Sequence, residues 1–168
     1  MKIPFQRQTH FDGYQLDEAY TGLRNQVLNL NPEVIGLSSH DNRKVWGVLM
    51  ETGYEKAIVT LLALADSTVS LYFSGGGGII GMGQHEGPAK VGQALVSEAS
   101  QFVANCQIVL DYPLPKQGNT RFYLLTFEGV FSTEAPEDDF GNTRHPVSPL
   151  FHTAHALINE IRLVDQNR

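Results

Sequence analysis

The sequence contains a single cysteine, Cys106, so no disulfide can form within the chain. A lone thiol is typical of proteins in a reducing compartment. The first seven residues lack the apolar core of a signal peptide. We therefore expect a cytoplasmic protein whose stability does not depend on a disulfide.

Long hydrophobic runs and clusters of basic residues are also missing. The longest apolar run, residues 57–65, is interrupted by Thr60 and is far shorter than the roughly 20 residues that span a bilayer. There are 12 Lys and Arg against 18 Asp and Glu, and the basic residues are scattered. Nucleic acids and anionic membranes bind clustered Lys and Arg, so the sequence predicts neither as a partner.

The composition is that of a globular protein. Hydrophobic residues make up 42% of the 168 residues, which is enough to bury a core without a structural metal. No repeat, linker or low-complexity tract divides the chain. We expect one domain over residues 1–168.

Apolar residues recur at helical spacing in three segments. The first lies between Leu16 and Leu30 and is followed by Asn31 and Pro32, which disfavour helix. The second helix begins near Pro88, and the third begins at Ser148. Their apolar faces are Leu16, Ala19, Tyr20, Leu23, Val27 and Leu30; Val91, Leu95, Ala99, Phe102 and Cys106; and Leu150, Phe151, Ala154, Leu157, Ile158, Ile161 and Val164.

Five segments have the composition of strands. They are residues 45–51, 57–65, 69–74, 108–112 and 121–131. Short turns join the first three, which predicts an antiparallel meander. Residues 113–119 and the acidic residues 134–146 are predicted to be loops. The order α-β-β-β-α-β-β-α predicts an α+β fold, with a five-stranded antiparallel sheet and three helices.

Two resemblances follow from these elements. Their order resembles the secretion-chaperone-like fold and, more loosely, roadblock and profilin-like domains, which wrap a five-stranded sheet in helices. Residues 45–51, together with residues 71–74 and the glycines that follow, resemble an uncharacterised bacterial protein family. The second resemblance implies a bacterial origin and brings no activity, substrate or catalytic residue with it.

Residues 75–83 form a glycine-rich segment between a predicted strand and a predicted helix. Gly76, Gly78 and Gly81 match the pattern G-x-G-x-x-G of dinucleotide sites, where glycines let the backbone approach a pyrophosphate. Gly83 also belongs to this segment, which would then line a ligand pocket.

His85 and Glu86 follow the glycines and would turn into such a pocket or form an acid–base pair. Against a dinucleotide site, the helix is not expected before Pro88, and the preceding strands are not parallel. The alternative is a structural hairpin or bulge whose Ile79 and Ile80 pack on the core. Glu86 alone would stabilise a helix N-terminus.

Three histidines lie close together near the C-terminus. His152 and His155 are separated by three residues on the predicted last helix, which brings them within reach of one metal ion. His145, with Asp138 or Asp139, would supply further ligands. The alternative is that these histidines are ordinary surface side chains.

Two further residues have two interpretations each. Glu51 ends an apolar segment, so it is either a partly buried carboxylate or the solvent end of a strand. Cys106 lies on an apolar stripe, which favours a core thiol over a nucleophile.

Because no catalytic or cofactor motif is complete, we expect no cofactor. The sequence favours a non-catalytic protein-interaction or regulatory module, secretion-chaperone-like or immunity-like, that contacts another protein and forms a homodimer. One alternative is a small-molecule or nucleotide binder, or an enzyme, that uses residues 75–83. A second alternative is a metal-binding protein that uses His152 and His155.

Overall fold

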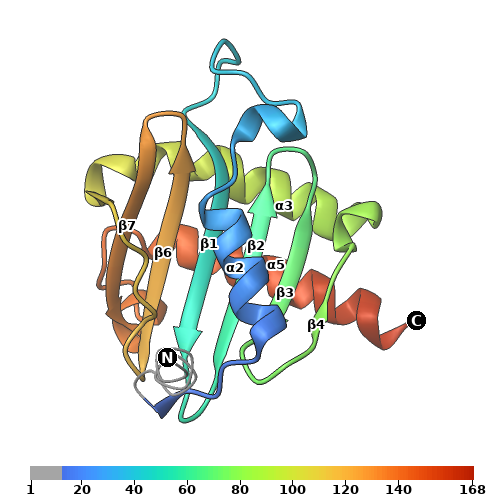
Figure 1. Ribbon diagram of the computed structural model, residues 1–168, viewed down its shortest axis with the longest axis vertical. Coiled ribbons are helices and arrows are strands. Elements are labelled where there is room, and N and C mark those ends of the chain that lie inside the picture. Colours follow the sequence, from blue (N-terminus) through green and yellow to red (C-terminus); the bar gives the residue numbers. More distant parts are fainter. Residues whose placement is uncertain (1–12) are drawn as a thin grey trace, which may run out of the picture.

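The computed structural model describes residues 13–168, and its fold is α+β (Figure 1). The expectation about the first seven residues lies outside this range. The described residues form one antiparallel sheet of seven strands in the order β4-β3-β2-β1-β6-β7-β5. None of their helices is long and apolar enough to cross a membrane.

The strands and helices have the following bounds. The strands are β1 (Val45–Gly53), β2 (Ile58–Leu64), β3 (Val69–Phe73), β4 (Gly78–Ile79), β5 (Gln107–Val109), β6 (Asn119–Thr126) and β7 (Gly129–Pro136). The α-helices are α2 (Glu18–Leu28), α3 (Glu86–Ala99), α4 (Glu137–Gly141) and α5 (Ser148–Gln166). Short 3-10 turns are η2 (Pro32–Ile35), η3 (Met82–Gln84) and η4 (Ser100–Asn105).

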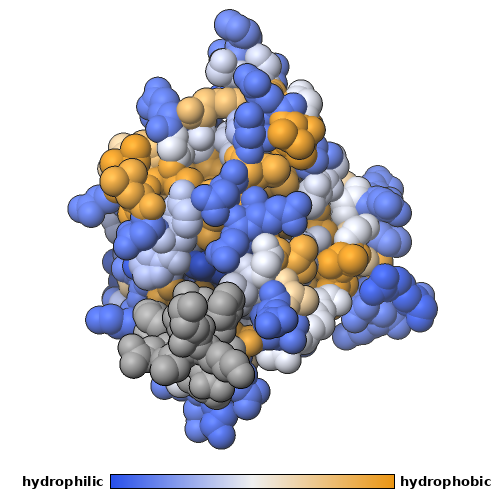
Figure 2. Space-filling view, viewed as in Figure 1, coloured by the Kyte–Doolittle hydropathy of each residue, from blue (hydrophilic) through white to orange (hydrophobic). Residues whose placement is uncertain are grey.

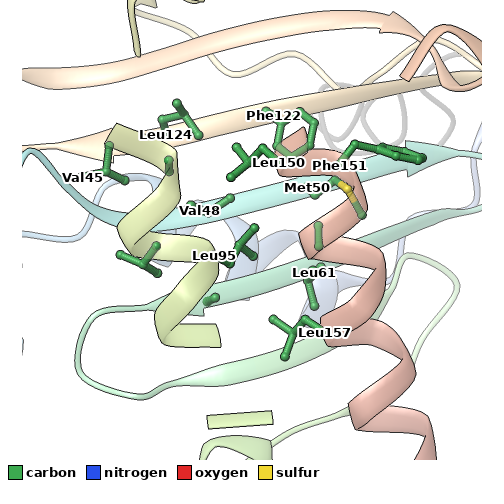
Figure 3. Close-up of a cluster of buried hydrophobic side chains, with 14 of the residues drawn as sticks. Val45, Val48, Met50, Leu61, Leu95, Phe122, Leu124, Leu150, Phe151 and Leu157 are labelled. Atoms are coloured by element: carbon green, nitrogen blue, oxygen red, sulfur yellow. The ribbon is translucent and has the colours of Figure 1, made fainter. Parts of the chain in front are cut away.

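The two faces of the sheet are covered by different helices (Figure 1). Helices α3 and α5 pack on one face, where Leu95 and Leu157 join the main hydrophobic core with Val48 and Leu61 of the sheet (Figure 3). Helix α2 lies on the opposite face, and its Leu28 belongs to a second core. The antiparallel sheet therefore buries apolar side chains on both faces in its centre.

The predicted meander is confirmed. Strand β1 pairs with β2, and β2 pairs with β3, both antiparallel. The β2–β3 turn is stabilised by Asp66, whose side chain accepts a hydrogen bond of 2.9 Å from the backbone N–H of Thr68. Ser67 in this turn adopts a positive φ of 77°. Aspartate and serine are turn formers because their side chains bond to the local backbone.

The predicted number of strands was wrong, first because residues 121–131 form two strands instead of one. The chain reverses after Thr126, whose hydroxyl donates to the carbonyl of Gly129 at 2.7 Å and accepts from the N–H of Glu128 at 3.1 Å. Gly129 has a φ of 142°, which favours glycine, and it begins β7. Apolar residues continue through the turn, so the alternating pattern hides it.

A second additional strand comes from the glycine-rich segment, where Gly78 and Ile79 form the short edge strand β4 beside β3.

The number of helices also differs from the prediction, because α4 occupies part of the predicted acidic loop. Phe140 of α4 is fully buried. Its ring stacks on that of Phe151 at a centroid distance of 5.5 Å. This aromatic contact anchors a segment whose composition indicates an exposed loop.

Strand β5 lies at the far edge of the sheet, although the strand that follows it in the chain lies near the centre. It pairs with β7 alone among the described strands and ends at Val109, earlier than predicted. Residues 110–118 must therefore cross β7 to reach β6. The hydroxyl of Tyr123 donates to the carbonyl of Pro113 in this crossing loop, and that of Tyr14 donates to Pro115 at 2.7 Å.

Candidate functional site

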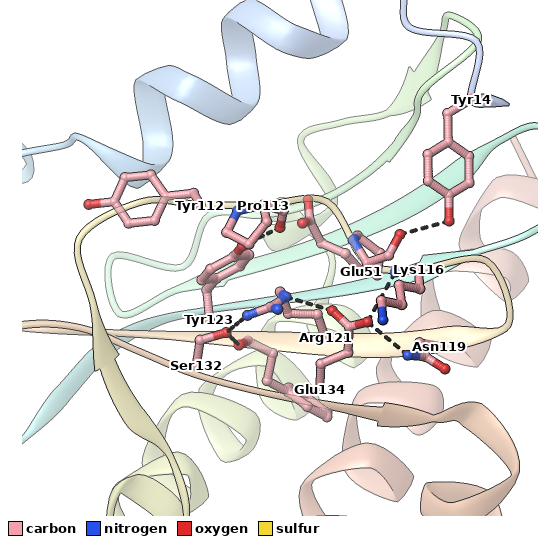
Figure 4. Close-up of polar contacts among 12 residues, drawn as sticks. Tyr14, Glu51, Tyr112, Pro113, Lys116, Asn119, Arg121, Tyr123, Ser132 and Glu134 are labelled. Carbon is pink, nitrogen blue, oxygen red and sulfur yellow. Dashed lines mark hydrogen bonds and ion pairs between the residues drawn. The ribbon is translucent and has the colours of Figure 1, made fainter. Parts of the chain in front are cut away.

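A row of polar side chains crosses the sheet on the face that α2 covers (Figure 4). Thr60 of β2 is directly opposite Glu51 of β1, and Glu51 is directly opposite Arg121 of β6. Arg121 is in turn opposite Glu134 of β7. Residues directly opposite each other in a sheet point to the same face, so these four form one continuous row.

Glu51 is the most deeply buried charge in this row, with no exposed surface. Its two carboxylate oxygens accept hydrogen bonds from Arg24 of α2 at 2.8 and 2.9 Å, a bidentate pair. It also accepts from the hydroxyl of Thr60 at 2.9 Å and from that of Tyr20 at 3.4 Å. Of the two interpretations offered for Glu51, the structure therefore shows a buried carboxylate.

The electrostatics follow from this burial. Burial alone would lower the pKa of Arg24, but attraction to Glu51 outweighs it and raises the pKa, so the guanidinium stays charged. The pKa values of Tyr20 and Tyr123 are raised, first by burial and then by the negative charge of Glu51. Both phenols therefore remain protonated at neutral pH.

Arg121 and Glu134 extend the network toward β7. The Nε of Arg121 donates to Glu134 at 2.8 Å, and its Nη1 donates to the hydroxyl of Ser132 at 2.7 Å. Glu134 also accepts from the backbone N–H of Lys116 at 3.0 Å and the side chain of Asn119 at 2.8 Å. The carboxylate thus holds one end of the loop that crosses β7.

Tyr123 lies between the two ion pairs. The guanidinium carbons of Arg24 and Arg121 are each 5.6 Å from the centre of its ring. Arg24 and Arg121 are balanced by Glu51 and Glu134, and each charge has at least one opposite partner within 2.8 Å. This network fastens α2 and the crossing loop to the sheet, and no charged group in it is left without a partner to act on a substrate.

The sequence analysis did not identify Arg24, because it assigned the buried face of the first helix to a neighbouring set of residues. The buried residues of α2 are Tyr20, Arg24 and Leu28, at a spacing of four. Leu23, which was assigned to the buried face, is 39% exposed. The spacing of Tyr20, Arg24 and Leu28 was the available signal, together with Glu51 at the end of an apolar segment.

The predicted glycine site divides between two places. Gly76 and Gly78 belong to the hairpin between β3 and β4. Gly81 and Gly83 line a shallow cleft of about 270 Å³ beside the β2–β3 turn. Ile79 packs against the main core, whereas Ile80 is 62% exposed.

The residues that follow the glycines lie at the start of α3, which begins slightly earlier than predicted. His85 is the residue before the helix, and Glu86 is its first residue. The side chain of His85 makes no capping hydrogen bond. A ligand at residues 75–86 stays a prediction.

The three predicted metal ligands occupy different surroundings. The ring of His145 lies 4.4 Å from that of Phe140, and its Nδ1 accepts from the N–H of Val147 at 3.0 Å. His152 is exposed, with its Nε2 3.3 Å from the hydroxyl of Thr143. The ring of His155 lies 4.3 Å from that of Phe151. Within residues 13–168 no three His, Cys, Asp or Glu side chains are grouped so that they could hold a metal ion.

Cys106 lies at the end of η4 and packs against the main core. Burial raises the pKa of its thiol to about 11, so it is protonated at neutral pH. A protonated thiol is a poor nucleophile, in line with its predicted role as a core thiol.

Apolar side chains gather outside the core along strand β5. Leu110, directly after the strand, is 96% exposed, and Ile108 within it is 56% exposed. Figure 2 shows apolar surface at the upper left, on the β7 side of the sheet. Of the large apolar side chains among the described residues, Leu110 is the most exposed.

Comparison of the chain with protein-family models, curated proteins and solved structures found no match. The resemblances drawn from the order of elements and from residues 45–51 therefore stay predictions, and function is argued below from the geometry alone.

Proposed function

We propose that this protein is a non-catalytic interaction module that contacts another protein through the outer edge of β5. This strand pairs with β7 on one side and with no described strand on the other. An edge strand presents backbone N–H and C=O groups that can pair with a strand of a second chain.

The observation that carries the proposal is the exposure of Leu110 and Ile108 at this edge. Soluble proteins usually protect edge strands with charged side chains or proline, because an apolar edge associates. Residues 105–110 contain neither a charge nor a proline. The uncharged, apolar edge is therefore better suited to a protein contact than to solvent.

The residue pattern around Ile108 favours a second copy of the chain as the partner. In an antiparallel pair centred on Ile108, Cys106 lies opposite Leu110 of the second copy, and Gln107 lies opposite Val109. Asp111 lies opposite Asn105, so no like charges meet. Such cross-strand pairs contribute roughly 0.2–1 kcal/mol each, and the two-fold arrangement uses each of these three pairs twice.

Substitution of Leu110 by lysine tests the proposal. We expect the wild-type protein to form a dimer, and Leu110→Lys to weaken association by about a hundredfold or more, because the dimer loses two leucines and burial of each is worth about 1.5–3 kcal/mol. Sedimentation velocity over a range of concentrations measures the effect. The free energy of unfolding of the monomer should not change, since Leu110 is almost fully exposed within its own chain.

Leu163→Lys is the matched control, because Leu163 is also an exposed leucine, 54% exposed, but lies on α5. It should associate like the wild type. A wild-type protein that stays monomeric at every concentration, or a Leu110→Lys variant that associates normally, would contradict the proposal.

A further inference from the structure

A second feature, independent of β5, is a cleft of about 450 Å³ between α5 and the β3–β4 side of the sheet. Figure 1 shows the C-terminal part of α5 extending past these strands. Nearer the centre of the sheet the space under the helix is filled by Leu157 and Leu61 (Figure 3). Toward the β4 edge of the sheet these side chains no longer fill the space under α5, and the cleft begins there.

One wall of the cleft is apolar. Val59 and Phe73 are directly opposite each other on β2 and β3, and Leu71 is opposite Ile79 of β4. Ile158 faces them from α5. All of these except Leu71 are only half-buried, so the cleft offers apolar surface that residues 13–168 do not cover. Clefts of this size and character are typical of small-molecule sites.

The other wall carries a positive charge without a partner. Arg162 of α5 makes no ion pair with any residue in 13–168. Asp165, which also lines the cleft, is 2.7 Å from the guanidinium of Arg168 and is neutralised by it. Of the two charged side chains that line the cleft, only Asp165 is therefore in an ion pair, and Arg162 is left to bind an anion.

His155 lies in the same wall, one turn from Ile158. Its Nε2 is buried and has no hydrogen-bond partner among the described residues. Its pKa is lowered, first by burial and then by the nearby His152, so the ring is neutral at pH 7. A buried polar atom without a partner is rare in native proteins, and a ligand or a water molecule in the cleft would supply one.

We propose that this cleft binds a small organic monocarboxylate with an aliphatic or aromatic body. The body lies against Val59, Phe73, Ile79 and Ile158, and Arg162 binds the carboxylate by charge-assisted hydrogen bonds. A small side-chain movement would let His155 offer a further polar contact. The site uses none of the residues of the β5 edge, so it holds or fails independently of the protein-interaction proposal.

Titration with octanoate, followed by NMR chemical shifts, tests the proposal. We expect binding with a Kd on the order of 1 mM, as is usual for a ligand of this size, and shift changes centred on Ile158 and Ile79. Octan-1-ol and octylamine have the same apolar chain without the negative charge. Both should bind at least about tenfold more weakly, because they lack the charge-assisted contact.

Two variants identify the residues responsible. Arg162→Glu should weaken octanoate binding at least about tenfold and remove the preference over octan-1-ol, whereas Arg43→Glu, an exposed arginine elsewhere, should bind like the wild type. Ile158→Trp should abolish binding by filling the cleft. Absence of octanoate binding, equal affinity for the three compounds, or an unchanged Arg162→Glu variant would each overturn the proposal.

Discussion

Replacement of Glu51 by alanine is expected to lower the free energy of unfolding by about 3–5 kcal/mol. The substitution leaves Arg24, which is 8% exposed, buried between α2 and the sheet without its counter-charge. It also removes an acceptor from Thr60 and Tyr20. The direct measurement is urea unfolding of the purified variant beside the wild type.

Two controls separate this effect from the loss of any carboxylate. Asp139→Ala removes one side of an exposed ion pair with Arg144 and should change stability by less than about 1 kcal/mol. The double variant Arg24→Met with Glu51→Leu removes both charges and should recover most of the loss, because apolar residues can replace a buried pair. Equal stabilities of Glu51→Ala and Asp139→Ala would show that the buried pair does not hold α2 to the sheet.

Gly83→Ala is expected to destabilise the protein by about 1–3 kcal/mol, toward the upper end of that range. A Cβ at this position would lie 1.6 Å from the carbonyl oxygen of Ser67 and 2.8 Å from its carbonyl carbon. The obstacle is backbone, so it cannot rotate away as a side chain would. Thermal and urea unfolding of the variant measure the effect.

Gly22→Ala is the matched control for this substitution. Gly22 lies within α2, and a Cβ there has no neighbour within 4 Å. Alanine should therefore stabilise the helix by up to about 1 kcal/mol. If Gly83→Ala is instead as stable as Gly22→Ala, the close approach of η3 to the β2–β3 turn is not needed for the fold, and a ligand role for Gly83 gains weight.

The β1–β2–β3 meander and helix α5 were predictable because the residue patterns that define them are local in the sequence. Residues 66–68 form a turn through their own side chains, and apolar spacing from Leu150 to Val164 defines one face of α5. The β6–β7 hairpin was missed because Phe127 and Phe131 continue the apolar alternation of Tyr123 and Leu125 through the turn. Residues 128–129 carry no Asn-Gly or Asp-Gly pair to mark a tight turn.

The polar row across the sheet and the unpaired outer edge of β5 both depend on the order of strands in the sheet. The spacing of residues along the chain does not reveal that order. Glu51 and Arg121 are opposite each other only because β6 lies beside β1. Leu110 is exposed only because β5 is placed outside β7 and the chain then crosses back. In the sequence, residues 108–112 have the composition of any strand, and nothing local distinguishes an edge strand from a central one.

The most direct test of the protein-interaction proposal places a photoreactive amino acid at position 110 of the purified protein. After illumination, we predict a product of twice the chain mass whose cross-links map to residues 104–108 of the second copy, and no such product when the group is at position 163. Absence of a protein adduct, or adducts spread over surfaces away from β5, would contradict the claim that this edge is a protein-binding surface.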